Sequence, residues 1–216
     1  MTHYVLWIDE AGRGPWCGPV VACCLCFDAC NMPEKEFLLQ IQDSKKLSHK
    51  KREEIFKKLI EMSRIEEANN RPQVLFGIGV VDNYVIDERN IKQANREAMK
   101  RSLEEVLRKI QYFSAWKKYT LDVLIDGNDK YVFEALQKPA TFIIWWDAKI
   151  LEIGAASIIA KVLRDRLMDV YDTVYPDLGI IDHKGYGTKK HADALKNSSC
   201  ITGIHRVSFK PIKNLL

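Results

Sequence analysis

The sequence predicts an α/β domain in which a central mixed sheet of five strands is flanked by helices. Short apolar runs alternate with longer stretches whose apolar residues recur every three or four positions, which is typical of strands alternating with helices. The first two runs follow each other across a short glycine loop, which favours an antiparallel pair and therefore a mixed sheet. The length of 216 residues suits one sizeable domain.

The first part of the chain predicts three strands and one helix. Residues 4–9 (YVLWID) and 19–27 (PVVACCLCF) are buried strands on either side of the glycine loop. Residues 48–64 form an amphipathic helix for which Ser48 is a suitable cap. Its apolar side carries Ile55, Leu59 and Met62. Residues 74–81 (VLFGIGVV) are the third strand.

The second part predicts two more strands and two long helices. Residues 86–110 form a helix whose apolar stripe is Ile91, Ala94, Ala98 and Leu103. Strands follow at 121–126 (LDVLID) and 140–146 (ATFIIWW), and a second long helix covers 151–171. Beyond Pro176 the chain is rich in loops, with one short helix near 189–196.

Charge and hydropathy narrow the class of protein. The formal net charge of +4 is only mildly basic and does not by itself predict a nucleic-acid partner. Basic residues are concentrated at 43–54 (DSKKLSHKKREE) and between Lys184 and Lys213, where seven Lys or Arg accompany one acid. We expect a cytoplasmic protein, because no apolar run reaches membrane-spanning length and no signal-peptide pattern opens the chain.

Five of the six cysteines lie between Cys17 and Cys30. Cys23 and Cys26 have CxxC spacing, but no second pair and no His pair follows at zinc-finger distance. Neighbouring residues of a strand point to opposite faces, so these thiols do not converge easily. We therefore interpret the cysteines as reduced apolar core residues that hold no zinc and form no disulfide.

Carboxylates stand at the ends of three expected strands. Asp9 and Glu10 end the first strand, Asp126 ends the fourth, and Asp147 follows the fifth. Each has an ordinary alternative, since Asp126 before a glycine suits a turn, Asp147 suits a helix cap and Glu10 suits a solvated strand end. The ends of strands on one side of an open α/β sheet nevertheless form its ligand crevice.

Taken together, the four carboxylates predict a site for divalent cations. Acids gathered at one point repel one another and resist ionisation, and bound Mg²⁺ or Mn²⁺ relieves that repulsion with hard oxygen ligands. Two such ions about 3.5–4 Å apart activate a water and stabilise the leaving oxygen in phosphodiester cleavage. The two basic segments would then hold a phosphate backbone.

The chain resembles the ribonuclease HII family of the ribonuclease H-like superfamily over nearly its whole length. The resemblance rests on several motifs in the family's order rather than on one. They are DEAGRGPWCGPVVA, DSKKLS, IDERNI, LIDGN, DAK, AASIIAKVLRDRLM, HKGYGT and HRVSF. The resemblance implies a ribonuclease H-like fold and one catalytic domain over 1–216, with 176–216 a basic extension packed on it.

The resemblance also implies an activity. The family is a metal-dependent endonuclease that cuts the RNA strand of RNA/DNA hybrids and nicks 5′ of ribonucleotides embedded in duplex DNA, leaving 3′-hydroxyl and 5′-phosphate ends. Its four catalytic, metal-binding carboxylates match Asp9, Glu10, Asp126 and Asp147, with Asp9 touching both of two Mg²⁺ or Mn²⁺ ions.

Substrate contacts are implied in the same way. The loop Gly12-Arg13-Gly14 matches the family segment that meets the 2′-hydroxyl, the group that distinguishes RNA from DNA. Tyr186 matches a tyrosine that packs against the sugar after the junction, although a turn tyrosine is the ordinary alternative. Three further residues match basic family positions that meet phosphate, with plain surface charge as the alternative; they are Lys45, Lys46 and Lys184.

Two departures and three alternatives accompany this resemblance. Trp145 and Trp146 precede Asp147 where many members carry Lys-Gly, and Val85 replaces a usual acid. The sequence leaves three alternative functions open. They are ribonuclease HIII, another nuclease of the superfamily such as a junction resolvase or integrase, and a nucleic-acid binder without enzymatic activity. We expect a monomer. The tail PIKNLL suits a packed helix turn or a terminal strand better than a sliding-clamp ligand.

Overall fold

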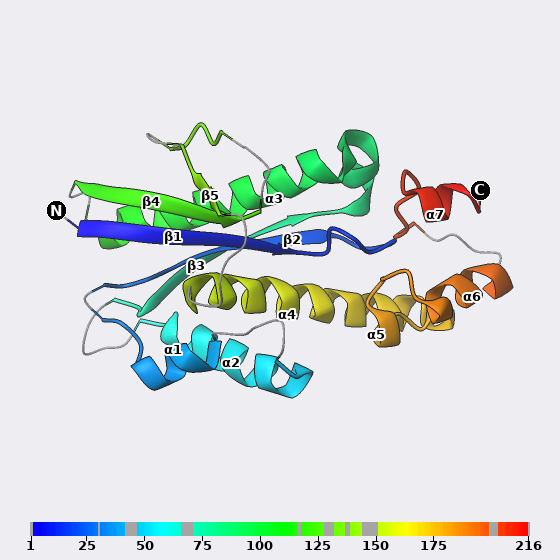
Figure 1. Ribbon diagram of the computed structural model, residues 1–216, viewed down its shortest axis with the longest axis horizontal. Coiled ribbons are helices and arrows are strands. Elements are labelled where there is room, and N and C mark those ends of the chain that lie inside the picture. The colour runs from blue at the N-terminus through cyan, green and yellow to red at the C-terminus, as the bar shows by residue number, and fades with distance from the viewer. Residues whose placement is uncertain are drawn as a thin grey trace.

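The computed structural model describes residues 2–29, 31–41, 47–65, 71–115, 118–127, 132–136, 139–143, 151–198 and 203–215 (Figure 1). Its centre is a mixed five-stranded sheet in the order β3-β2-β1-β4-β5. The strands are β1 (Thr2–Ala11), β2 (Val20–Phe27), β3 (Val74–Val81), β4 (Tyr119–Asp126) and β5 (Thr141–Ile143). β1 pairs antiparallel with β2 and parallel with β4, which confirms the expected mixed sheet.

Helices cover both faces of this sheet. The helical elements of the described residues are α1 (Lys35–Ile41), α2 (His49–Met62), α3 (Asn83–Phe113), α4 (Leu151–Val174), the 3₁₀ turn η1 (Pro176–Leu178), α5 (Ile180–His183), α6 (Lys189–Ser198) and α7 (Lys210–Lys213). Figure 1 shows α3 along one face and α4 along the other, with α1 and α2 beyond α4. Two apolar cores result, one between the sheet and α3 and one between the sheet, α4, α1 and α2.

Local sequence explains these elements. Every residue of β2 is buried because the strand is covered on both faces, which suits its unbroken apolar run. Ser48 caps α2 as expected, since its hydroxyl accepts a hydrogen bond from the Lys51 amide at 3.3 Å. The predictions missed α1, which at seven residues is too short to show a helical period.

The long helix α3 contains a kink that its sequence pattern does not reveal. Asn90 has φ 67° and ψ 160°, and its Oδ1 accepts hydrogen bonds from the amides of Lys92 and Gln93. Asn90 therefore acts as a cap that restarts the helix inside the IDERNI motif. The apolar stripe continues past it, and Ala94, Ala98 and Leu103 are fully buried.

The chain after α4 packs on the end of the sheet that carries the strand-end acids. A third apolar core joins Cys17 of the glycine loop, Met168 of α4 and residues of η1 to α7. The tail begins as a packed helix turn, because Ile212 in α7 is fully buried. In the part of the chain that the structure describes, no helix has the length and apolar character needed to cross a membrane.

Candidate active site

Two strand-end acids lie side by side in the sheet. Ile8 of β1 is paired with Ile125 of the parallel strand β4, so Asp9 and Asp126 follow at the same level and on the same face. That face is the one covered by α4, whose Ser157 hydrogen-bonds the Asp9 carboxylate. The prediction that separate segments bring acids to one sheet edge is therefore supported for these two residues.

The Asp9 carboxyl is almost completely buried, at 7% exposed. Burial raises its pKa well above the usual value, and the charges of Glu10 and Asp126 raise it further. Ser157 and the Glu10 amide, which donates to Asp9 Oδ1 at 2.7 Å, only partly oppose this. The protein alone therefore disfavours a negative charge at Asp9, which is the condition that a bound cation reverses.

Glu10 lies beside Asp9 with one oxygen paired and one unpaired. Arg13 Nη1 donates to Glu10 Oε1 at 3.2 Å, whereas Oε2 is buried and no described residue meets it with hydrogen-bond geometry; the Asn95 side chain of α3 is nonetheless close enough to lower the pKa of Glu10. Burial raises the pKa of Glu10, Arg13 opposes the shift, and Asp126 adds to it. A buried carboxylate oxygen without a donor is costly unless a cation or water meets it.

Two buried arginines hold the glycine loop in place. Arg206 donates to the carbonyls of Gly12 at 2.6 Å, Arg13 at 3.0 Å and Gly18 at 2.8 Å. Arg164 of α4 donates to the carbonyls of Pro19, Lys184 and Cys17 at 3.0–3.3 Å. The guanidinium groups thus satisfy six main-chain carbonyls, five between residues 12 and 19 and one at Lys184, and they tie these carbonyls inward.

Gly12 and Gly14 differ in their surroundings. Gly12 has φ +98°, and a Cβ there would lie 2.2 Å from Arg164 Nε. Gly14 has an ordinary φ, and no atom lies within 4 Å of the place where its Cβ would be. Gly12 is therefore required by the loop itself, whereas Gly14 leaves its outer side open.

A cleft of about 420 Å³ opens beside these acids. Its walls come from the end of β1, the glycine loop, α2, α4 and the turn before α6. The lining residues are Glu10, Ala11, Gly12, Arg13, Gly14, Arg52, Ser157, Ile158, Lys161 and Tyr186. Tyr186 is 39% exposed, and its ring lies under Lys161 Nζ at 5.3 Å. The Glu10 carboxylate, open backbone, basic side chains and an aromatic ring therefore share one hollow, whereas Asp9 and Asp126 are not among its lining residues.

The other expected site residues are not all in this cleft. Asp147, Lys45 and Lys46, with Trp145 and Trp146, fall outside the described residues. Lys184 is described, and its ammonium pairs with Asp169 of α4, while its carbonyl accepts from Arg164. Its expected contact with phosphate stays a prediction, and a substrate would have to compete with Asp169 for it.

Sequence reasoning missed the residues that support the site. Ser157, Lys161, Arg164 and Arg206 lie in the motifs of the sequence, but no role was expected for any of them. Arg164 and Arg206 are both fully buried. The one signal in the sequence that would have indicated Arg164 is an arginine on the otherwise apolar face of a helix, because a buried charge needs several partners.

The family model of ribonuclease HII matches residues 6–212. The chain belongs to the ribonuclease HII family. Ribonuclease HII of Acholeplasma laidlawii is 42% identical over 214 residues, which cover 99% of this chain and 90% of that protein. Ribonuclease HII proteins are ribonuclease H endonucleases, and this chain is such an enzyme.

Solved structures agree with this assignment. Ribonuclease H2 of Pyrococcus horikoshii OT3 is 26% identical with a TM-score of 0.63, covering 98% of this chain and 96% of its own. Two further structures share the fold. RNase HII in the PCNA:RNase HII complex from Archaeoglobus fulgidus has a TM-score of 0.62 and 23% identity, covering 96% of this chain and 95% of its own. Bst-RNase HIII in complex with Mn²⁺ has a TM-score of 0.66 and 16% identity, covering 99% of this chain and 69% of its own. The predicted ribonuclease H-like fold is confirmed.

The acids at the sheet end fit the divalent metal on which ribonuclease H enzymes depend. Asp9, Glu10 and Asp126 offer only oxygen atoms, the ligand type that Mg²⁺ and Mn²⁺ prefer. Their mutual repulsion and the unpartnered Glu10 Oε2 are both relieved by a cation.

Proposed function

We propose that this enzyme cleaves the RNA strand of RNA/DNA hybrids and nicks 5′ of ribonucleotides embedded in duplex DNA. The products would carry 3′-hydroxyl and 5′-phosphate ends. The convergence of Asp9, Glu10 and Asp126 beside a cleft walled by the glycine loop carries the proposal. Asp147 is the proposed fourth carboxylate.

The carboxylates would hold two divalent ions, Mg²⁺ or Mn²⁺. When bound, such ions supply an activated water and charge stabilisation at the leaving oxygen. Asp9 would contact both ions, as the family resemblance implies, and the charges of Glu10 and Asp126 both act on it. Arg13 would keep Glu10 oriented through its 3.2 Å contact, and Ser157 would do the same for Asp9. These contacts preserve the geometry of the ligands between turnovers.

The glycine loop would read the ribose. Arg206 draws the Gly12 and Arg13 carbonyls inward, and the outer side of Gly14 is open to the cleft. A sugar can therefore approach the main chain of Gly12-Arg13-Gly14 without meeting a side chain at Gly14. Tyr186 would pack against the neighbouring sugar from the opposite wall, while Lys45, Lys46 and Lys184 would meet phosphates on the flanks.

Cleavage of a duplex containing one ribonucleotide, run in parallel with Mg²⁺ and Mn²⁺, tests this function. Asp126→Asn should lose most activity but retain binding, because it removes a charge and keeps the shape. Asp122→Asn on the same strand is the matched control, since Asp122 is exposed and pairs with His3. Near-normal turnover of Asp126→Asn, or equal loss in both variants, would exclude Asp126 from the site.

A sliding clamp is a second candidate partner. The Archaeoglobus fulgidus RNase HII was solved in complex with PCNA. In this chain the tail presents exposed Leu215, but Ile212 is buried and would have to leave the core to add to a contact.

We propose that the enzyme works as a monomer in the cytoplasm, where its buried free thiols would stay reduced.

A further inference from the structure

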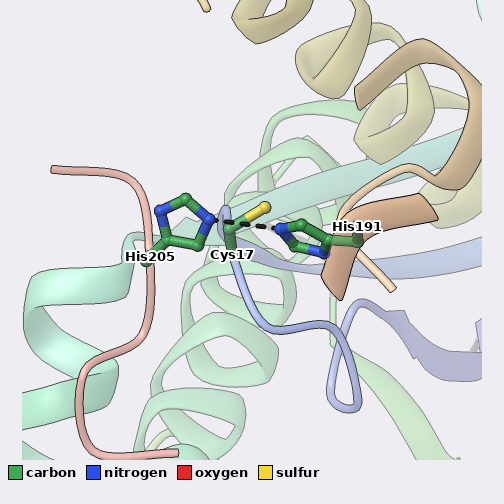
Figure 2. A group of neighbouring side chains, drawn as sticks. All are labelled: Cys17, His191 and His205. Carbon is green, nitrogen blue, oxygen red and sulfur yellow. Dashed lines mark hydrogen bonds between the residues drawn. The ribbon is translucent and has the colours of Figure 1, made fainter. Parts of the chain in front are cut away.

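A second group of potential ligands lies apart from the carboxylates. Cys17 comes from the glycine loop, His191 from α6 and His205 from the segment before α7 (Figure 2). Their ligand atoms all lie within 4.8 Å of one another, and the two Nε2 atoms are 3.2 Å apart. Figure 2 shows the two rings facing each other along the dashed hydrogen bond, with the Cys17 sulfur beside that line in this view. All three residues are buried.

The hydrogen bonds around His191 leave its inner nitrogen ready to bind a cation. Nδ1 lies 3.1 Å from the Tyr186 carbonyl, which can only accept, so Nδ1 carries the proton and Nε2 carries the lone pair. Burial, the first of several causes, lowers the pKa of His191 to about 4 and keeps the ring neutral. A ligating histidine commonly donates its other N–H to a carbonyl in this way.

The neighbouring His183 is not part of the ligand set, but it fixes the orientation of His191. The two rings are stacked, with centroids 4.3 Å apart and planes 10° from parallel. Both nitrogens of His183 are used locally, Nε2 against the Leu178 carbonyl at 2.9 Å and Nδ1 against the Gly185 amide at 3.1 Å. The stacking therefore holds His191 with Nε2 toward His205 and Cys17.

Contrary to the expectation that the cysteines hold no zinc, we propose that Cys17 Sγ, His191 Nε2 and His205 Nε2 form a three-ligand site for a Zn²⁺ ion. Tetrahedral zinc with Zn–N of about 2.05 Å and Zn–S of about 2.3 Å places two nitrogens about 3.3 Å apart and a nitrogen and sulfur about 3.6 Å apart. In the metal-free protein the two Nε2 atoms are joined by a hydrogen bond of 3.2 Å, which His205 donates because His191 Nε2 carries the lone pair, and this spacing is close to the first value. A water would complete the coordination; binding would release the Cys17 thiol proton to solvent, and the ring proton of His205 would move from Nε2 to Nδ1, so that both Nε2 atoms face the ion with a lone pair.

The position of the three residues gives the site its role. Cys17 and His205 already form an isolated antiparallel bridge, and His205 precedes Arg206, which holds the carbonyls of the glycine loop. An ion here would fasten α6 and the C-terminal segment to the loop that borders the catalytic cleft. Burial raises the pKa of the Cys17 thiol to about 11, so the loss of its proton opposes binding and the ion must compensate for it.

Co²⁺ added to metal-free protein in excess Mg²⁺ tests the proposal directly. We expect a thiolate-to-cobalt absorption band in the near ultraviolet at one ion per chain, removed by Zn²⁺. The carboxylate site has no sulfur and gives no such band. Zn²⁺ at about 100 times its Kd should raise Tm by about 5–10 °C.

Cys17→Ala should abolish both the band and the Zn²⁺-dependent rise in Tm. Cys26→Ala is the matched control, because Cys26 is equally buried but lies in β2 outside the group. Absence of the thiolate band from wild-type protein overturns the proposal without any variant, as does a band that survives in Cys17→Ala. Ribonucleotide cleavage with Mg²⁺ is measured separately, so failure here leaves the nuclease assignment intact.

Discussion

Replacement of Gly12 by alanine should destabilise the folded protein strongly, although the change adds only one methyl group. The backbone at Gly12 has φ +98°, a region that costs an L-residue roughly 1–2 kcal/mol. The new Cβ would also lie 2.2 Å from Nε and 2.5 Å from Cδ of Arg164, and 2.7 Å from the Pro19 carbonyl oxygen. Arg164 must therefore move, because the Pro19 oxygen belongs to the backbone.

The displacement of Arg164 sets the larger part of the cost. Its guanidinium donates to the carbonyls of Pro19, Lys184 and Cys17, and hydrogen bonds to a charged group contribute about 1.5–3 kcal/mol each. Loss of one or two of them adds about 2–5 kcal/mol to the strain at Gly12. The sum is roughly 3–7 kcal/mol, which at about 3 °C per kcal/mol corresponds to a fall in Tm of about 10–20 °C for a chain of this length.

Thermal unfolding followed by circular dichroism, with urea unfolding as a second measurement, checks this value. Gly14→Ala is the matched control, because its Cβ meets no atom within 4 Å and its φ is ordinary. Its Tm should stay within about 2 °C of wild type, as surface changes cost about 0.5 kcal/mol or less. If Gly12→Ala unfolds at the same Tm as Gly14→Ala, Arg164 does not hold the loop through the contacts described above.

Three further outcomes are expected. Gly14→Val and Tyr186→Ala should fold normally but lower kcat/KM more on a single embedded ribonucleotide than on a long hybrid; an unchanged ratio of the two, with both rates near wild type, would refute the junction-reading role. Asp126→Asn should raise the Tm of metal-free protein, because it removes a charge that repels Asp9, and calorimetry without divalent ions measures this. The raised pKa of Asp9 means that the folded state keeps its proton to higher pH than the unfolded state, so its contribution to stability falls as pH rises from the usual carboxyl range through the raised pKa. The Tm of Asp9→Asn relative to wild-type protein should therefore rise with pH over that window, and Mg²⁺ should reduce this difference. A Tm difference that does not depend on pH would contradict the raised pKa of Asp9.

The sequence alone predicted the sheet and part of the site because both depend on local patterns. Strands and helices show their period within a few residues, so all five strands and the long helices were predicted. An acid at the end of a strand is equally local, and parallel pairing then brings Asp9 and Asp126 to one level. The sequence did not predict shorter features such as α1 and the kink at Asn90. A helix of seven residues, or an unusual φ at one residue, leaves no periodic signal.

The tertiary structure decided which distant side chains meet. Arg206 contacts Gly12 from 194 positions away, and Cys17 lies beside His191 and His205, although no spacing in the sequence links them. Lys184 forms an ion pair with Asp169, which the basic segment around Lys184 did not indicate. Such contacts depend on how the C-terminal extension packs against the sheet end. Burial there forces each polar group to find a partner, wherever in the chain that partner lies.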